Sequence, residues 1–261
     1  MCNGSRIDLD VFMVGIFSDI ESQISQQFVT KFGQEVGVCN QLLKVYEAFL
    51  SATSGKVKDN DFPKWTNLMF LSQTLPLMNN ALYLLSKGYL RSSESLIRIA
   101  AEGMVMSAYF LEFPEAEVEY RSLNFRDFFH KHRIADMLKK VQKDGKILVT
   151  DKTKAKEIQW HQIVFKNLYE EASRFVHADL DVIYSVTRDQ MGTNPEDEKL
   201  IMGPQLYPDD ILAMGLRRIL NTTLFSLVVL GMSLNIMPDP SEKVIMDQAQ
   251  KITDKLIYTN P

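Results

Sequence analysis

The chain has 261 residues, of which 46% are apolar and 24% are charged, and its formal net charge is -4. A chain of this length can bury a core without disulfides or metal ions, as one large domain or two small ones. The composition excludes a fibrous or disordered protein, and the overall charge gives no general attraction to nucleic acid or to an acidic membrane. The charge is unevenly distributed, because residues 121–160 carry a local net charge of +6.

Cysteine content and hydropathy indicate a cytoplasmic protein. Two cysteines, Cys2 and Cys39, cannot form a disulfide framework, and the N-terminus lacks the basic leader and apolar core of a signal peptide. Residues 219–237 are uncharged and reach the length of a membrane span, but six of these nineteen residues are Asn, Ser or Thr. Hydrocarbon would leave their polar groups unsatisfied, so we favour a buried bundle helix over a transmembrane helix and expect no membrane partner.

Apolar residues at helical spacing predict helices in the first half of the chain. Residues 6–30 and 34–52 are predicted as two helices that separate near Gly33. Another helix is expected to begin at Asp61, with a proline in its first turn, and to end or kink at Pro76. A long helix should then continue to residue 111, before Phe113 and Pro114 end it.

The second half of the chain is predicted to be helical as well. Residues 115–142 and 157–181 are expected to form one helix each, and residues 185–204 are the least regular stretch. Two more helices are expected, over residues 208–237 and 241–258. The predicted fold class is therefore all-α, an antiparallel helical bundle with additional N- and C-terminal helices. Its domains are an N-terminal region of residues 1–60 packed on a core of residues 61–261, or one single domain.

A polar row runs along the apolar helix that ends near residue 111. Its members, at intervals of four, three and four residues, are Arg91, Ser95, Arg98 and Glu102. A helix that is apolar on most sides is usually buried, so the polar side chains in this row need partners or water. This requirement makes the row a candidate site.

A second polar row lies on the predicted helix 157–181. Its members are Glu170, Arg174, His177 and Asp181. Histidine exchanges a proton near neutral pH, arginine can hold a phosphate with two hydrogen bonds, and a carboxylate can orient the imidazole. If the two rows face each other, they contain the parts of a phosphate-handling site. The alternative is an interhelical salt-bridge network in which His177 is a hydrogen-bonded core residue.

Two segments resemble a family. ALYLLSKGYLRSSESLIRIAAEGMVMSAYFL, residues 81–111, and the later NLYEEASRFVHADLD are similar to a group of uncharacterised bacterial all-helical proteins usually placed near the HEPN superfamily. These proteins pair an R-x-x-x-E helix with a later S-x-x-x-H helix, which Arg98, Glu102, Ser173 and His177 match. The resemblance implies an antiparallel bundle, often a homodimer. Many HEPN members are metal-independent ribonucleases of toxin–antitoxin or phage-defence systems, and others only bind nucleotides or proteins.

The arginine and histidine spacing departs from the HEPN ribonuclease pattern. Those enzymes typically have four to six residues between the arginine and the histidine, whereas only two residues separate Arg174 and His177. One literal match exists, from Arg126 to His132, with Asp127 directly after the arginine. Both lie in the basic stretch, for which we favour a solvated face over RNA binding. Its interleaved Phe128 and neighbouring phenylalanines are expected to be buried in the bundle.

The first functional hypothesis is a HEPN-like RNA-targeting enzyme, and its roles follow the resemblance. Arg98 and Arg174 would hold the scissile phosphate, His177 would act as general base or acid, and Glu102 or Glu170 would orient a partner. Arg126 and His132 form a second catalytic candidate. The substrate-binding candidates are Arg91, Ser173 and Glu170.

Two alternatives stay open. One is a non-catalytic protein-interaction module that dimerises, and the other is a bundle that binds a small anionic ligand or a nucleotide. The expected partners are thus a second copy, RNA or a nucleotide, and an antitoxin or another protein. No Glu-x-x-His pair, P-loop, GxGxxG or HExxH occurs, so no metal or cofactor is predicted.

Overall fold

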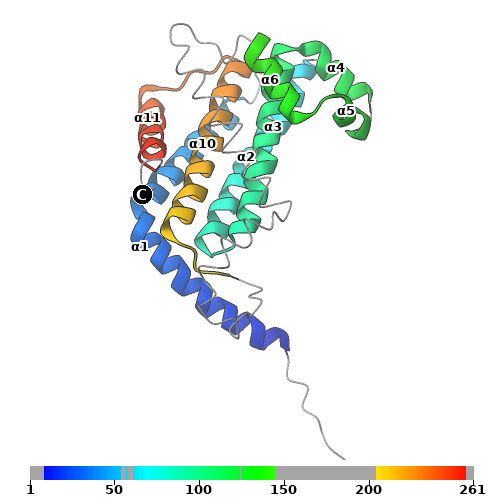
Figure 1. Cartoon of the computed structure of the whole chain (residues 1–261). Helices are drawn as coiled ribbons and strands as arrows, with labels where there is room; N and C mark the ends of the chain where they lie inside the picture. The colour runs from blue at the N-terminus through cyan, green and yellow to red at the C-terminus, as the bar shows by residue number, and fades with distance from the viewer. Residues whose placement is uncertain (1–8, 54–56, 58–60, 124, 145–203, 257–261) are drawn as a thin grey trace, which may run out of the picture.

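A computed structural model of the chain describes residues 9–53, 57, 61–123, 125–144 and 204–256. Within these ranges every regular element is an α-helix, so the predicted all-α class is confirmed. Three helices form the centre of the fold: α2 (Phe62–Ser86), α3 (Leu90–Glu112) and α10 (Asp209–Leu234). Helices α2 and α3 pack against each other most extensively, and α10 packs on both (Figure 1).

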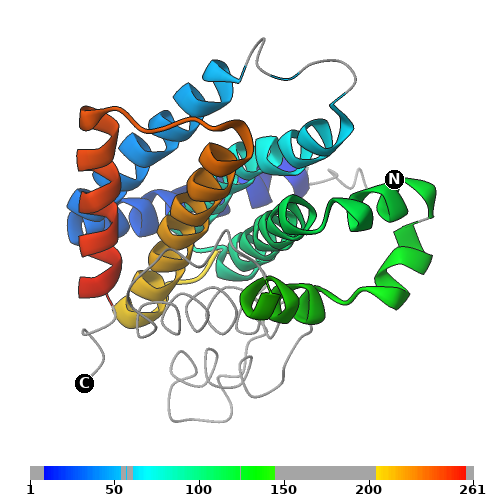
Figure 2. The ribbon, with the colours of Figure 1, turned by 90° about the horizontal axis from the view of Figure 1, so that it is seen from above.

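The remaining helices surround this centre. The long helix α1 (Leu9–Ala52) packs on α2 and α10, and α11 (Pro240–Lys255) packs on α1 and α10. Three short helices, α4 (Pro114–Ser122), α5 (Phe125–Lys131) and α6 (Ile134–Asp144), follow α3. Figure 2 shows α11 on one side of α10 and the short helices on the other. The side chains of α6 that face α3 include the buried Met137, Leu138 and Val141.

Helix α1 consists of two helical segments that meet at a kink, where the sequence predicts two helices. It is kinked at Phe32, whose φ of -117° and ψ of 20° are not helical, beside the predicted break at Gly33. Both sides of the kink keep an apolar face on the bundle, since Phe28 before it and Leu42 after it are buried. Hydrophobic burial thus continues across the kink at which the two helical segments meet.

The predicted break at Pro76 is wrong, because α2 runs through this residue to Ser86. Pro76 lies on the exposed face of α2, where water can solvate the carbonyl that loses its hydrogen bond. Beyond it, Met78 and Leu85 are fully buried, so the continuing helix gains apolar burial that offsets the lost bond. The chain reverses at Gly88 instead, whose φ is +81°.

Gly88 joins three parts of the fold. Its carbonyl accepts a hydrogen bond from the Gln205 backbone N–H at 3.0 Å, which ties residues 204–208 to the α2–α3 turn. A Cβ at this position would lie 2.4 Å from the Gln205 carbonyl oxygen and 3.0 Å from Cδ1 of Ile24. Only glycine therefore fits both the positive φ and the close approach of the backbone.

We expect Gly88→Ala to lower the free energy of unfolding by about 1–3 kcal/mol, the cost of forcing a side chain into a strained backbone conformation. Gly37→Ala is the control, because nothing lies within 4 Å of its added Cβ. In the exposed interior of α1 that change should stabilise the protein by about 0.5–1 kcal/mol. Urea unfolding of both variants measures the contrast, and equal effects would contradict the strain at Gly88.

The predicted single helix over residues 115–142 is also wrong, because the chain forms α4, α5 and α6 there. The breaks let α5 fold back toward α3 and α4. Phe128 of α5 meets Tyr120 of α4 with ring centroids 5.0 Å apart and Phe110 of α3 at 6.0 Å. Phe128 is fully buried, which confirms its predicted burial.

Among the described residues, α10 alone is long and apolar enough to cross a membrane. In its most apolar stretch 78% of the residues are buried inside the protein. Its polar side chains, including Thr222 and Ser226, face this interior. Such burial is also what a core helix of a bundle shows.

Candidate functional site: a row of arginines and glutamates on α3

The structure describes only part of the predicted site. Glu170, Ser173, Arg174 and His177 lie outside the described residues, so the facing of the two polar rows stays a prediction. The described candidates are Arg91, Arg98 and Glu102 on α3, with Arg126 on α5 and His132 just after it.

Arg98 and Glu102 form an ion pair, which their spacing of about one helical turn allows. Nε of Arg98 donates to Oε1 of Glu102 at 3.0 Å, and the two side chains are 19% and 31% exposed. Arg91, near the start of the helix, is exposed. The hydroxyl of Ser95 donates to the Arg91 carbonyl at 2.9 Å, so Ser95 bonds to its own helix.

A buried ion pair that was not predicted from the sequence lies in the same row. Nη1 of Arg218 on α10 donates to Oε1 of Glu94 at 2.6 Å, and these side chains are 3% and 0% exposed. Glu94, Arg98 and Glu102 follow one another at intervals of four residues and therefore share one side of α3. We call Arg91, Glu94, Arg98 and Glu102 the α3 row.

A close contact between helices brings Arg218 to the α3 row. Gly215 of α10 packs where a Cβ would lie 3.0 Å from Leu85 and 3.6 Å from Leu90. Arg218 lies about one turn after Gly215 on α10, and Glu94 lies about one turn after Leu90 on α3. The close packing at Gly215 and Leu90 therefore brings Arg218 to Glu94. A sequence signal existed, since Arg217 and Arg218 are the only cations of the otherwise apolar α10, and a cation on a buried helix needs a partner.

The α3 row and Arg218 together carry three positive and two negative charges, a net charge of +1. Glu102 holds Nε of Arg98, which orients the planar guanidinium and its two Nη groups. A guanidinium held in this way is suited to bind phosphate with two parallel hydrogen bonds. The arrangement can therefore position an anion, and the buried ion pair fixes the helix that carries it.

Tyr207 lies close to the exposed end of the α3 row. Burial raises the pKa of the Tyr207 hydroxyl above its ordinary value, and the positive charge of Arg91 opposes part of this rise. The phenol therefore stays a neutral hydrogen-bonding group near Arg91 at physiological pH.

Arg126 and His132, the second catalytic candidate, contact different partners. Nε of Arg126 donates to Nε2 of His130 at 3.5 Å. Nε2 of His132 lies 2.9 Å from Oε2 of Glu119, and its ring stacks on Phe128 with centroids 4.6 Å apart. These contacts favour a structural role for His132 between α4 and the end of α5.

Glu119 also binds Lys131, and hydrogen bonds from Lys131 and then His132 lower the pKa of its carboxyl. Two residues of the basic stretch, Lys131 and His132, are thus paired with an acidic neighbour. Lys140 lies over the Phe113 ring at 4.1 Å from the centroid, so a third packs against an aromatic residue. The basic stretch is consequently less available to nucleic acid than its composition suggests.

The described residues contain no group of three or more His, Cys, Asp or Glu placed to hold a metal ion. The chemistry that they offer is that of the α3 row, with guanidinium groups, carboxylates and the nearby phenol of Tyr207. In comparisons with protein-family models, curated proteins and solved structures, nothing matches this chain.

Proposed function

We propose that this protein is a HEPN-like RNA-targeting enzyme that cleaves RNA without a metal ion, as a cytoplasmic homodimer of a toxin–antitoxin or phage-defence system. The observation that carries the proposal is the α3 row. Arg98 is partly exposed and held by Glu102 at 3.0 Å, one turn from the buried Glu94–Arg218 pair. An arginine ordered in this way loses little side-chain entropy when it binds a phosphate.

The proposed reaction is the transfer of a phosphoryl group within the RNA. Arg98 and Arg174 hold the scissile phosphate, and His177 takes the proton from the ribose 2′-hydroxyl. The 2′-oxygen forms a bond to phosphorus while the bond from phosphorus to the 5′-oxygen breaks, and the leaving oxygen takes up a proton. Glu102 or Glu170 orients a partner, and Arg91 and Ser173 contact the substrate.

A second candidate function is favoured by the same ion pairs. Arg98 and Arg218 each bind a glutamate, which is what an internal polar network would show in a non-catalytic module that dimerises or binds a protein partner. Under that reading, changes in the α3 row alter stability and leave RNA binding unchanged. A third possibility is a bundle that binds a small anionic ligand at the α3 row. It would share the anion site of the proposed enzyme and, like the non-catalytic module, carry out no reaction.

RNA binding by Arg98→Gln distinguishes these functions. We expect this variant to bind labelled single-stranded RNA about 10-fold or more weakly than wild type, because a charge-assisted hydrogen bond contributes about 1.5–3 kcal/mol. The slope of log affinity against log salt should also become shallower by about one. Affinity is measured by fluorescence anisotropy at several salt concentrations.

Lys64→Gln is the matched control. Lys64 is a partly exposed cation that pairs with Asp61 at 2.6 Å, and it lies at the start of α2. Because α2 and α3 are antiparallel, this position is at the far end of α3 from Arg91. Wild-type affinity in Lys64→Gln and reduced affinity in Arg98→Gln support the proposal. Unchanged affinity in Arg98→Gln, with a lower melting temperature, would instead establish the internal network.

A further inference from the structure

Helix α2 carries a row of exposed side chains without charge. The members of this row follow one another at intervals of four or three residues and therefore share one face of the helix. They are Trp65, Met69, Gln73, Pro76, Asn80 and Tyr83, which we call the α2 face. None of residues 65–86 is charged. A surface helix ordinarily turns charged residues to the solvent, so the α2 face is atypical of a surface that meets only water.

Three large side chains dominate the α2 face. Met69 is 67% exposed, Tyr83 59% and Trp65 40%. Tyrosine, tryptophan and methionine are enriched in protein interfaces, whereas charged residues are depleted from their centres. The α2 face is thus typical of a surface that another protein covers.

The row continues to a charged residue at each end. Asp61, directly before α2, lies four positions before Trp65, and Lys87, directly after α2, lies four positions beyond Tyr83. Asp61 pairs with Lys64 at 2.6 Å, and because both side chains are partly exposed the carboxylate can accept from a second cation. A matching partner therefore has an uncharged centre and the opposite order of charges at its ends.

We propose that the α2 face is the interface of a symmetric dimer, in which it packs antiparallel on the α2 face of a second copy. A two-fold dimer presents the same surface from both copies, so an uncharged centre meets an uncharged centre. In the antiparallel arrangement each Asp61 lies opposite Lys87 of the second copy, and each Trp65 opposite its Tyr83. A parallel arrangement would instead place the two Lys87 side chains together, and like charges exclude that register.

Gln73 and Pro76 lie at the centre of the antiparallel arrangement. Because Pro76 has no N–H, the Ser72 carbonyl lacks its usual hydrogen bond within the helix. A buried backbone acceptor needs a partner, which water supplies in the single chain. In the dimer the Gln73 amide of the second copy can donate to this carbonyl.

The size of the α2 face fits a reversible dimer. From Trp65 to Tyr83 the row is about 27 Å long, at a rise of 1.5 Å per residue. The three large side chains expose roughly 300 Å² together, since a side chain of this size presents about 200 Å². That is half of the area, about 600 Å², that each partner buries at the lower limit of specific interfaces. The exposed polar members of the row add to it.

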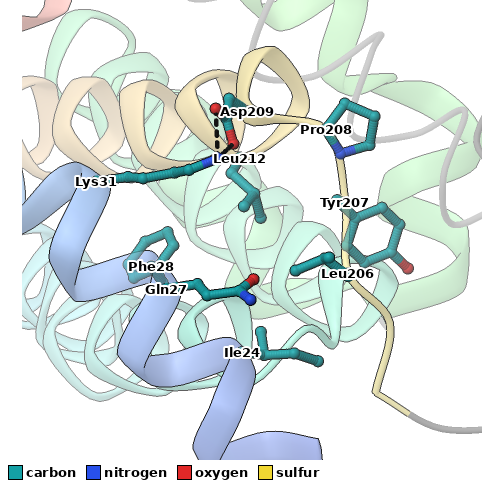
Figure 3. A pocket seen from close by; sticks show the side chains of 9 residues that line it. All are labelled: Ile24, Gln27, Phe28, Lys31, Leu206, Tyr207, Pro208, Asp209 and Leu212. Carbon is teal, nitrogen blue, oxygen red and sulfur yellow. Dashed lines mark hydrogen bonds and ion pairs between the residues drawn. The ribbon is translucent and has the colours of Figure 1, made fainter.

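A pocket between α1 and the segment that leads into α10 is less open to a partner. Its apolar walls, Phe28, Leu212 and Tyr207, are at most 8% exposed. Lys31 and Asp209, which also line it, bond to each other (Figure 3). Packing and pairing within the chain thus already satisfy these groups, whereas the large side chains of the α2 face remain exposed.

The test is the molecular mass of the full chain in solution, measured by sedimentation velocity over a range of concentrations. We expect wild type to reach twice the 29.9 kDa of one chain. Met69→Glu should weaken the dimer at least about 10-fold, because each copy would bury an unpaired carboxylate in the interface. Val244→Glu is the matched control, since Val244 is 54% exposed on α11, which packs on α1 and α10. It should dimerise as wild type does.

An exchange of charges tests the antiparallel register. Lys87→Glu places a carboxylate opposite Asp61 of the second copy and should weaken the dimer, and the double variant Asp61→Lys/Lys87→Glu should restore it. The α2 interface would be overturned by a wild type that stays at the mass of one chain or by a dimer that Met69→Glu leaves unchanged. A double variant no tighter than Lys87→Glu would overturn it as well.

The homodimer rests on the proposed function, and the same preparations show which of the two fails. RNA cleavage by a protein that stays monomeric removes the α2 interface and leaves the ribonuclease. A dimer that Met69→Glu disrupts, without RNA binding or cleavage by wild type, removes the ribonuclease and leaves the α2 interface.

Discussion

Replacing Arg218 with methionine is expected to lower the free energy of unfolding by about 3–5 kcal/mol, the cost of leaving a buried charge without its partner. Arg218 and Glu94 lie 2.6 Å apart with side chains 3% and 0% exposed, so water cannot take over the role of the guanidinium. Methionine keeps most of the side-chain length, and the loss therefore reports on charge more than on packing. Urea unfolding monitored by circular dichroism measures it.

Two further variants make this prediction specific. Lys31→Met breaks the Lys31–Asp209 pair, whose members are more than half exposed, and should change stability by at most about 1 kcal/mol. The double variant Glu94→Leu/Arg218→Met removes both buried charges and should recover most of the loss, because apolar residues often replace a buried pair without cost. An Arg218→Met effect no larger than that of Lys31→Met would refute the energetic role of the buried pair.

Local patterns in the sequence predict the features that depend on neighbouring residues. The sequence places Arg98 and Glu102 in one polar row, and their spacing of four residues allows the ion pair that the structure shows. The helical period likewise predicts the burial of Phe128. The end of α3 before Phe113 agrees with the predicted stop at Phe113 and Pro114, whereas its start after Gly88 was not predicted, because the sequence analysis continued one helix from Pro76 to residue 111.

Contacts between distant segments could not be predicted in this way. Glu94 and Arg218 are separated by 124 positions, and the hydrophobic period of a helix does not say which faces of two helices meet. The Lys31–Asp209 ion pair joins segments 178 positions apart and was not predicted for the same reason. At Pro76 a local signal is overridden, because the burial of the following turns outweighs one lost hydrogen bond.

Replacing His177 is expected to cause the largest loss of activity. A general base or acid typically contributes 10²- to 10⁴-fold to rate, so His177→Ala should lower RNA cleavage by about that factor while the protein stays folded. His130→Ala is the matched control, because His130 is an exposed histidine on α5 that contacts Arg126. Its cleavage rate should stay within about twofold of wild type, as expected for a group outside the proton transfer.

Metal-independent RNA cleavage is tested most directly by the degradation of labelled total RNA by the purified protein in chelator and at low salt. Wild type, His177→Ala and His130→Ala are compared after their melting temperatures show equal folding. We expect cleavage by wild type and His130→Ala and almost none by His177→Ala. Cleavage that survives in His177→Ala, or cleavage that the chelator abolishes in wild type, would contradict a metal-independent ribonuclease that uses this histidine.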